Sequence, residues 1–381
     1  MSDLTNQRPT RIRVDLDALA HNLTAIRART GTAVMGIVKA NAYGHGLIPV
    51  AKHLEACGVE RLGVAFVEEG IALRRAGVRV PILVMGGIYG KQVEAFLEHD
   101  LEITVSSIDK LRLVEAAADA KGQRARVHLK IDTGMNRIGV HHARCGAFLE
   151  AALTSSGCEP VGLYSHLACA DDPGHPLTAL QLERFMAACA QAEKICAAAG
   201  VSMPIRHLAN SGGVLHHPAT WLDLVRPGIA LFGALPDPVA RDTVGLNPVL
   251  LTRVVYFKVV QRGETVSYGA TWTAERDTRV VTLPIGYGDG FPRALSSKGE
   301  VLVRGERKRI VGRICMDQFM VDLGPGGTAY NEDEVVLIGA QGSGSGEQRI
   351  SVEDVAQAAG TIPYEILTGL NERIPKEYVV S

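Results

Sequence analysis

Short apolar, β-rich runs alternate with helix-like stretches from Ala33 to Val225, and this alternation constrains the fold of the chain more than any other feature. Strands that alternate with helices form a parallel sheet, and eight such units predict a (β/α)8 barrel. The clearest helix is predicted over Leu177–Ala199, where apolar residues recur at helical spacing and Gly200 supplies a stop. The eight runs are Ala33–Val38, Leu62–Val67, Val80–Met85, Leu101–Val105, Val127–Ile131, Val161–Tyr164, Ile205–Leu208 and Leu222–Val225.

Beyond Pro248 the pattern changes to closely spaced strands separated by turn residues, which predicts a mainly β domain. The fold class is therefore α/β, with a (β/α)8 barrel over residues 13–245 followed by a mainly β C-terminal domain over residues 246–381. Residues 1–12 are a possible addition to that second domain. The strands expected in it are Val249–Val260, Val280–Pro284, Val301–Arg304, Arg309–Ile314, Phe319–Leu323 and Val335–Ile338.

The charge balance favours a small-molecule substrate. The chain has 40 basic and 41 acidic residues and a formal net charge of -1, which gives no electrostatic reason to expect nucleic acid or an anionic membrane as a partner. Residues 1–13 are polar, and no apolar run approaches the roughly 20 residues of a membrane span, so we expect a soluble, cytoplasmic protein. The seven cysteines show no C-x-x-C spacing, so neither a disulfide framework nor a metal site is expected.

Polar side chains gather where the predicted barrel strands end, which is the end that carries the reactive groups in barrels of this type. Lys39 ends the first run, and partial desolvation there would lower the pKa of its amine and suit it to act as nucleophile or base. An equally simple interpretation is a lysine that caps a strand edge. Lys130 and Arg137 follow the fifth run, and His166 ends the sixth.

The loops after the last two barrel strands have the chemistry of a phosphate site. They contain Asn210, Ser211, Gly228 and Ile229, and backbone N–H groups with a hydroxyl can hold a dianion there. A phosphate site opposite a strand-end lysine is what pyridoxal phosphate requires. Each loop could also be ordinary barrel structure. No G-x-G-x-x-G follows a strand and no G-x-x-x-x-G-K-[ST] occurs, so a nucleotide site is disfavoured.

An ordered series of motifs over residues 11–378 resembles the bacterial alanine racemase family. It consists of G-I-V-K-A-N-A-Y-G-H-G around Lys39, K-I-D-T-G-M-N-R-I-G around Arg137, H-L-A-N-S-G around Ser211, V-R-P-G-I-A-L-F-G around Arg226, V-S-Y-G around Tyr268, G-Y-G-D-G around Tyr287, G-R-I-C-M-D around Met316 and I-P-Y-E around Tyr364.

The resemblance implies a pyridoxal phosphate-dependent racemase that interconverts L-alanine and D-alanine with two bases. Lys39 would carry the cofactor as an imine and serve as one base, and Tyr268 of the partner subunit in a homodimer would serve as the other. Racemisation needs this arrangement, because one group must remove the α-proton from one face while another returns a proton to the opposite face. A free tyrosine has a pKa of about 10, so neighbours must stabilise its phenolate. The resemblance gives that role to His166.

The resemblance also assigns the groups that hold cofactor and substrate. Arg226 would face the pyridine nitrogen and, as a pure donor, keep it unprotonated. Arg137 would donate to the cofactor's phenolic oxygen and help to bind substrate. Lys130 matches a lysine that is carbamylated in some members, and a plain Lys130–Asp132 ion pair is the alternative. The phosphate would be held by Tyr43, Asn210, Ser211, Gly228, Ile229 and Tyr364, and the substrate by Met316, Tyr268 and Tyr287.

Three other functions stay open at this point. A broader-specificity amino-acid racemase differs by only a few pocket side chains, although Tyr364 favours a narrow pocket. A decarboxylase of the same architecture would offer an acidic group to the pyridine nitrogen, where this chain has Arg226. A pyridoxal phosphate carrier would be a lone barrel with no use for a second domain. For a racemase, D-alanine could be made for peptidoglycan or be catabolised, since the reaction has an equilibrium near unity.

Overall fold

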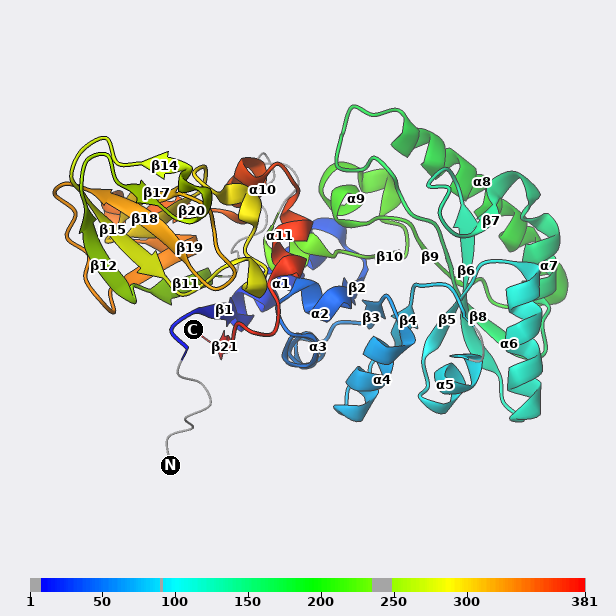
Figure 1. Ribbon diagram of the computed structural model, residues 1–381. Helices are drawn as coiled ribbons and strands as arrows, with labels where there is room; N and C mark the ends of the chain where they lie inside the picture. Colours follow the sequence, from blue (N-terminus) through cyan, green and yellow to red (C-terminus); the bar gives the residue numbers. More distant parts are fainter. Residues whose placement is uncertain (1–7, 90–91, 235–248, 381) are drawn as a thin grey trace.

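A computed structural model describes residues 8–89, 92–234 and 249–380. It consists of two bodies that lie side by side, a barrel wrapped by helices and a mainly β domain (Figure 1). Among the described residues, no helix is long and apolar enough to cross a membrane.

Eight parallel strands form the nearly closed barrel, which confirms the predicted fold class. The strand order is β10-β2-β3-β4-β5-β6-β8-β9, and the short strand β7 (Val140–His141) adds to β6. The seam between β9 and β10 is bridged by the N–H groups of Asp223 and Arg226, which donate to the carbonyls of Arg206 and Ala209. The strands are β2 (Ala33–Ile37), β3 (Arg61–Val64), β4 (Ile82–Val84), β5 (Glu102–Val105), β6 (Ala125–Asp132), β8 (Cys158–Tyr164), β9 (Ile205–His207) and β10 (Leu224–Val225).

Helices connect these strands and cover the outside of the barrel. Helix α8 spans Leu177–Ala199, as the sequence pattern predicts, and Gly200 ends it in the left-handed conformation at φ 68°. The others are α1 (Leu16–Thr30), α3 (Leu47–Ala56), α4 (Val67–Arg75), α5 (Gln92–Glu98), α6 (Ile108–Ala120), α7 (Gly146–Leu153) and α9 (Ser211–His216).

The C-terminal domain is built on one large, mostly antiparallel sheet. Its strands follow the order β12-β15-β18-β17-β16-β19-β11-β1-β21, with β20 added to β19 and with β1 (Arg11–Asp15) from the N-terminus. A separate hairpin consists of β13 (Thr265–Val266) and β14 (Trp272–Thr273), and the two helices of this domain are α10 (Val352–Ala359) and α11 (Pro363–Gly369). The strands of the large sheet that come from the C-terminal half are β11 (Val249–Arg253), β12 (Tyr256–Val260), β15 (Thr278–Leu283), β16 (Glu300–Val303), β17 (Glu306–Val311), β18 (Phe319–Gly324), β19 (Glu334–Gln341), β20 (Gln348–Ile350) and β21 (Lys376–Val379).

The prediction of a single strand over Val249–Val260 is wrong. The chain turns a corner at Val254 and Val255, because the N–H of Val254 donates to Asp333 while that of Val255 donates to Thr282 on another strand. As a result β11 pairs with β19 and β1, whereas β12 pairs with β15. A continuous apolar run does not reveal such a change of partner.

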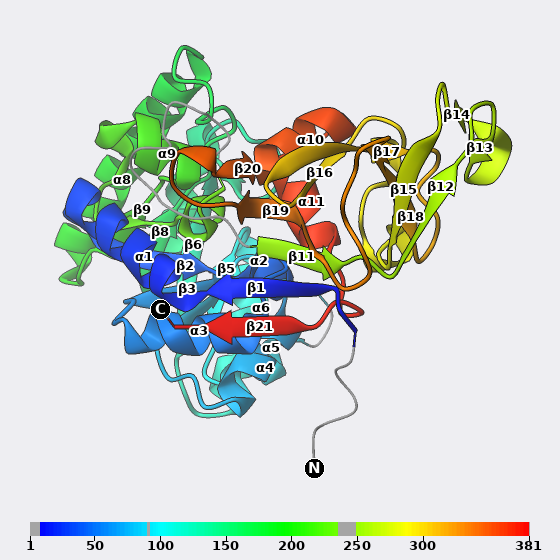
Figure 2. The same cartoon turned by 90° about the vertical axis from the view of Figure 1, so that its left-hand side faces the viewer.

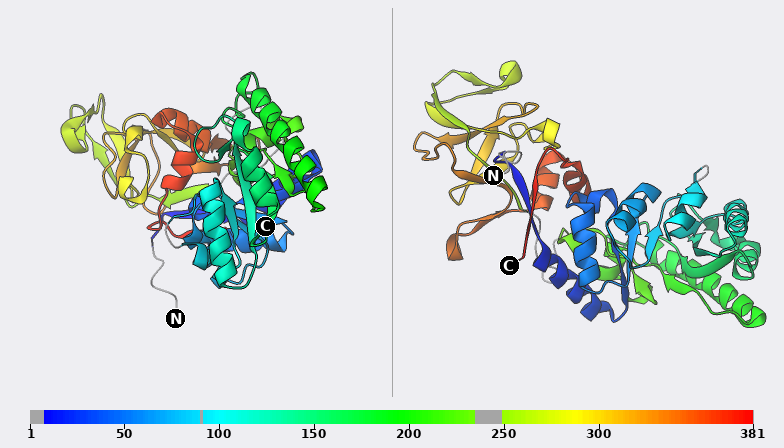
Figure 3. Two further views of the ribbon diagram at one scale, coloured as in Figure 1. Left: turned by 90° about the vertical axis from the view of Figure 1, so that its right-hand side faces the viewer. Right: turned by 90° about the horizontal axis from the view of Figure 1, so that it is seen from below.

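The N-terminal strand β1 (Arg11–Asp15) lies in the C-terminal sheet, antiparallel to β11 and parallel to β21. Figures 2 and 3 show β1 and β21 together at the junction of the two bodies. The proposed boundary at residue 13 falls inside this strand, all of which pairs with the C-terminal sheet. The proposed boundary between residues 245 and 246 lies outside the described residues.

Candidate active site

Lys39 lies at the start of an unusual turn, α2 (Lys39–Tyr43), directly after strand β2. The four residues from Ala40 to Tyr43 all have φ between 51° and 55°, a left-handed conformation that costs non-glycine residues about 1 kcal/mol or more each. The Glu69 carboxylate accepts the N–H of Ala40 at 2.7 Å and that of Ala65 at 2.8 Å, and so ties the turn to the next strand. This geometry fixes the backbone on both sides of the lysine.

The amine of Lys39 is set for chemistry near neutral pH. Burial lowers its pKa, the nearby Arg137 guanidinium lowers it further, and Glu69 partly offsets both. A lysine with a lowered pKa holds less of its proton at neutral pH, which is what a nucleophile or base needs.

Further basic side chains lie at the mouth of the barrel. Lys130 is buried, its ammonium lies 4.0 Å from the centre of the Tyr164 ring, and burial together with Arg226 and Arg137 holds its pKa well below the usual value. The pKa of His166 is also far below its usual value, because of burial and the charges of Lys130 and Arg226. The guanidinium groups of Arg226 and Arg137 supply the positive charge at this place, and they favour an anionic ligand.

The alternative of a Lys130–Asp132 ion pair is not found in the described part of the chain. The Oδ1 atom of Asp132 accepts the N–H groups of Gly134 at 3.0 Å and Asn136 at 3.1 Å, and therefore shapes the loop that leads to Arg137. The negative charge of Asp132 only weakly opposes the lowered pKa of Lys130.

The two glycine-containing loops pack closely against each other and against Tyr43. The buried Ser211 hydroxyl accepts the N–H groups of Gly228 at 2.9 Å and Ala230 at 3.3 Å. A Cβ atom on Gly228 would lie 2.3 Å from the Tyr43 hydroxyl, so only glycine lets the phenol approach this loop. The other predicted anchors lie on the same elements or against them: Asn210 caps α9 by accepting the N–H of Gly213, Ile229 is buried, and the ring of Tyr364 on α11 is 6.1 Å from that of Tyr43.

Arg226 is held firmly at the end of β10. Its Nη2 donates to the carbonyls of Ser165 at 2.7 Å and Leu208 at 3.1 Å, and its Nη1 bonds Nδ1 of His207 at 2.9 Å. Burial lowers its pKa to about 10, so the guanidinium stays charged at neutral pH.

Sequence reasoning missed three buried residues linked to Arg226, namely Glu102, His128 and His207. Each stands inside a run that was predicted as an ordinary apolar strand. The available signal was a titratable residue inside each of three mostly apolar runs, since a buried polar group requires a partner.

Three predicted site residues lie together elsewhere, on the C-terminal domain. The N–H of Tyr287 donates to Cys315 at 3.1 Å and that of Gly288 to Met316 at 2.8 Å, which joins the loops of Tyr287 and Met316. Tyr268 and Met316 line a cavity of about 500 Å³, and their exposed fractions are 72 % and 54 %.

The predicted site residues therefore form two groups on one chain. Hairpin β13–β14, which flanks Tyr268, lies at the end of the C-terminal domain that points away from the barrel (Figures 1 and 2). Tyr364 is different, because α11 packs against α2 of the same chain.

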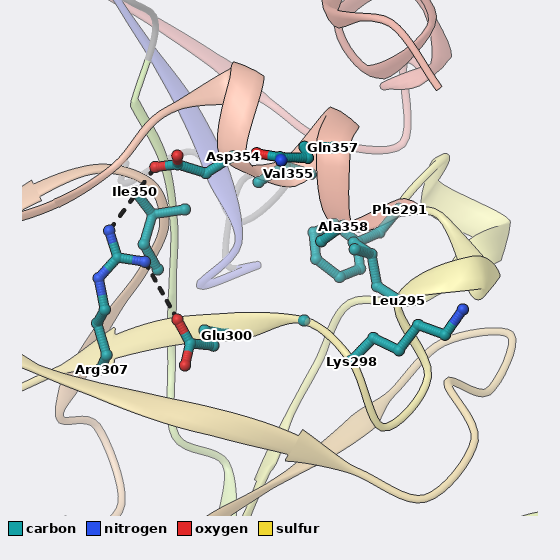
Figure 4. Close-up of a pocket in the computed structure, with 11 residues that line it drawn as sticks. Phe291, Leu295, Lys298, Glu300, Arg307, Ile350, Asp354, Val355, Gln357 and Ala358 are labelled. Carbon is teal, nitrogen blue, oxygen red and sulfur yellow. Dashed lines mark hydrogen bonds and ion pairs between the residues drawn. The ribbon is translucent and has the colours of Figure 1, made fainter. Parts of the chain in front are cut away.

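Another cavity, of about 220 Å³, lies between α10 and strands β16 and β17 (Figure 4). Arg307 spans it between Glu300 at 3.1 Å and Asp354 at 3.7 Å. Lys298 also lines the cavity, so two basic and two acidic side chains balance there. None of the predicted site residues lines it.

Comparisons with known proteins agree over the whole length of the chain. The alanine racemase N-terminal domain model matches residues 14–236, and the alanine racemase C-terminal domain model matches residues 249–378. Alanine racemase of Symbiobacterium thermophilum is 44% identical over 99% of this chain and 98% of its own length. The crystal structure of alanine racemase from Streptomyces lavendulae has a TM-score of 0.92 at 40% identity, with 99% of this chain and 98% of that chain covered.

A further solved structure is alanine racemase from Bartonella henselae with covalently bound pyridoxal phosphate. It has a TM-score of 0.86 at 28% identity, with 97% of this chain and 99% of that chain covered. Matches to both domain models and to full-length relatives at this identity show that the chain belongs to the alanine racemase family.

Proposed function

We propose that this protein is a pyridoxal phosphate-dependent racemase that interconverts L-alanine and D-alanine. The observation that carries the proposal is the Lys39 amine with its lowered pKa, which lies near the Arg137 guanidinium at the mouth of a barrel. Membership of the alanine racemase family supplies the reaction class. Both domain models match, so the decarboxylase and the single-domain carrier are not favoured.

The residues present fit the cofactor. The Ser211 and Gly228 loops, with the Tyr43 hydroxyl against the bare Cα of Gly228, suit the phosphate. The charged guanidinium of Arg226 can only donate, so it would leave an aromatic ring nitrogen unprotonated. When bound through Lys39, the cofactor supplies an electron-withdrawing group that makes the α-proton of the amino acid acidic.

Two bases on opposite faces of the substrate would then exchange its α-proton. Lys39 would act on one face, and its lowered pKa suits it to that role. Tyr268 would act on the other, with His166 stabilising the phenolate. Arg137 would donate to the cofactor's phenolic oxygen and to substrate. The N–H of Met316 would meet the substrate carboxylate, with Tyr287 beside it.

Tyr268, Met316 and Tyr287 would reach the barrel of a second copy, so the active form would be a homodimer with two shared sites. Two features of the chain support this. All three side chains are exposed, with Tyr268 and Met316 around a cavity on the C-terminal domain, and hairpin β13–β14 points away from its own barrel (Figure 1). A cytoplasmic location and a supply of D-alanine to peptidoglycan stay predictions.

A substrate panel tests the proposed activity. Purified protein with added pyridoxal phosphate is given each enantiomer of alanine, serine, lysine and arginine, in heavy water. We expect loss of optical rotation and α-deuterium exchange with alanine, and little with the larger amino acids. Release of carbon dioxide would support a decarboxylase instead. Equal turnover of serine or lysine would support a broader racemase, and no exchange with any amino acid would refute the proposal.

A further inference from the structure

A row of buried polar side chains crosses the interior of the barrel and ends at Arg226. Glu102 on β5, His128 on β6 and His207 on β9 are joined to it by hydrogen bonds of equal length. Oε2 of Glu102 lies 2.9 Å from Nε2 of His128, Nδ1 of His128 lies 2.9 Å from Nε2 of His207, and Nδ1 of His207 lies 2.9 Å from Nη1 of Arg226. All four residues are 3 % exposed or less.

The chemistry of the two end groups fixes the direction of every bond in this row. Arg226 can only donate, so Nδ1 of His207 must be a bare acceptor. The remaining proton of a neutral His207 then sits on Nε2 and is donated to Nδ1 of His128. His128 in turn carries its proton on Nε2 and donates it to Glu102. One proton on Nε2 of each imidazole satisfies all three bonds.

Protonation states in the barrel agree with this pattern. Burial lowers the pKa values of His128 and His207, so both imidazoles are neutral at pH 7. Burial alone would raise the pKa of Glu102, but the hydrogen bonds from His128 and Arg61 and the charge of Arg61 oppose it, and the pKa falls to about 2. Glu102 is therefore an ionised acceptor, and its other oxygen bonds Arg61.

The surroundings hold the two rings in place. A Cβ atom on Gly162 would lie 2.0 Å from Nδ1 of His128, so this glycine makes room for the ring. The ring of Tyr164 stacks on that of His207, with centroids 4.7 Å apart and planes within 4°. Neither imidazole can rotate freely to exchange its donor and acceptor atoms.

We propose that Glu102, acting through His128 and His207, is a positioning residue that orients the Arg226 guanidinium toward the ligand. This rests on the proposed function, in which Arg226 donates to the ring nitrogen of the cofactor. The described bonds of Arg226 use three of its five N–H groups, two toward backbone carbonyls and one toward His207. The bond to His207 fixes the position of Nη1. Because the guanidinium is planar and rigid, this bond also fixes the direction of its other N–H groups.

Glu102→Gln is the direct test, because glutamine cannot accept from both neighbours with both terminal atoms. If its amide nitrogen faces His128, both imidazole tautomers reverse and a donor meets Arg226. If it faces Arg61, His128 keeps its tautomer but donates to a neutral oxygen in place of a carboxylate, so the bonds along the row are weaker and the ring signals still shift. Glu60→Gln is the matched control. Glu60 is also a barrel glutamate bonded to an arginine, Arg27 at 3.0 Å, and has no link to Arg226.

The first measurement is ¹⁵N NMR of the histidine rings in the purified holoenzyme. We expect a proton on Nε2 and none on Nδ1 of both imidazoles, in the unmodified protein and in Glu60→Gln. Glu102→Gln should shift both ring signals and weaken cofactor binding about 10-fold, the loss of a hydrogen bond to a charged group. An Nδ1-protonated or doubly protonated ring in the unmodified protein would overturn the proposal, as would a Glu102→Gln protein with unchanged rings and affinity.

A second pair of variants keeps the test decisive if Glu102→Gln does not fold. His207→Gln offers an oxygen to Arg226 and an N–H to His128, whereas His207→Leu offers neither, and both lose the stacked ring. We expect His207→Gln to bind pyridoxal phosphate at least 5-fold more tightly than His207→Leu. Equal affinities would mean that His207 only fills space. If the unmodified protein shows the expected tautomers but does not racemise alanine, the proposed function fails and the hydrogen-bonded row stands.

Discussion

Gly228→Ala is the sharpest test of the phosphate site, because the structure gives the size of the clash. The new Cβ atom would lie 2.3 Å from the Tyr43 hydroxyl, and ordinary contact begins at 3.4 Å, so the hydroxyl must retreat by about 1 Å. Tyr43 is 6 % exposed and packs against Phe232 and Tyr364, which leaves its ring little room.

A retreat of about 1 Å removes one hydrogen bond to a charged phosphate in the proposed complex. Such a bond contributes about 1.5–3 kcal/mol, so pyridoxal phosphate should bind about 10- to 100-fold more weakly. Apoenzyme titrated with cofactor and followed by absorbance measures this directly. Gly326→Ala is the matched control, since a Cβ atom there meets nothing within 4 Å.

The double variant Tyr43→Phe/Gly228→Ala separates the clash from other effects. Removing the hydroxyl relieves the closest contact, so Gly228→Ala should cost much less affinity in the Tyr43→Phe background than in the unmodified protein. Additive losses would refute the reasoning that the two residues act on one phosphate contact. Unchanged cofactor affinity in Gly228→Ala alone would refute the placement of the phosphate against Tyr43.

Three further outcomes are expected. If Lys130 is carbamylated, activity falls in bicarbonate-depleted buffer and returns when bicarbonate is added, and indifference to bicarbonate excludes a catalytic need for the modification. Tyr268→Phe should lower racemisation by about 10²- to 10⁴-fold, while one enantiomer of alanine still exchanges its α-proton in heavy water. Equal loss of exchange for both enantiomers would contradict the assignment of one base to each face of the substrate. Glu102 has a folded pKa of about 2 against a usual 4.5, so its contribution of about 3 kcal/mol is present above pH 4.5 and lost as pH falls toward 2. In urea unfolding, the free energy of unfolding of the unmodified protein should then fall more steeply between pH 5 and 2 than that of Glu102→Gln. Parallel pH profiles of the two proteins would contradict this contribution from Glu102.

The pattern of the chain predicts its architecture well, for physical reasons. Strands buried on both faces are continuous apolar runs, so the barrel strands are visible in the sequence. Helix α8 is equally visible, because its buried stripe has helical spacing and Gly200 ends it. In a barrel the C-terminal ends of the strands converge, which is why Lys39 and His166 were expected together from position alone.

Features that depend on partners distant in sequence could not be predicted. The chain bends at Val254 because the N–H groups of Val254 and Val255 donate to different segments, at Asp333 and Thr282. No local sequence pattern predicts these two acceptors. The left-handed turn after Lys39 involves four non-glycine residues, and the contacts that hold it include the carboxylate of Glu69. Local preference argues against such a turn, so tertiary contacts have overridden it.

The row from Arg226 to Glu102 explains how the barrel tolerates a buried cation at its active end. An isolated buried guanidinium would be strongly destabilising, and a carboxylate in direct contact would neutralise the charge that a ring nitrogen acceptor needs nearby. Two neutral imidazoles place the negative charge on the far side of the barrel instead. There Glu102 forms an ion pair with Arg61, and the Arg61 side chain is partly exposed to solvent. Arg226 thus keeps a compensating charge in the same network, a fixed orientation and its full donor strength toward the ligand site.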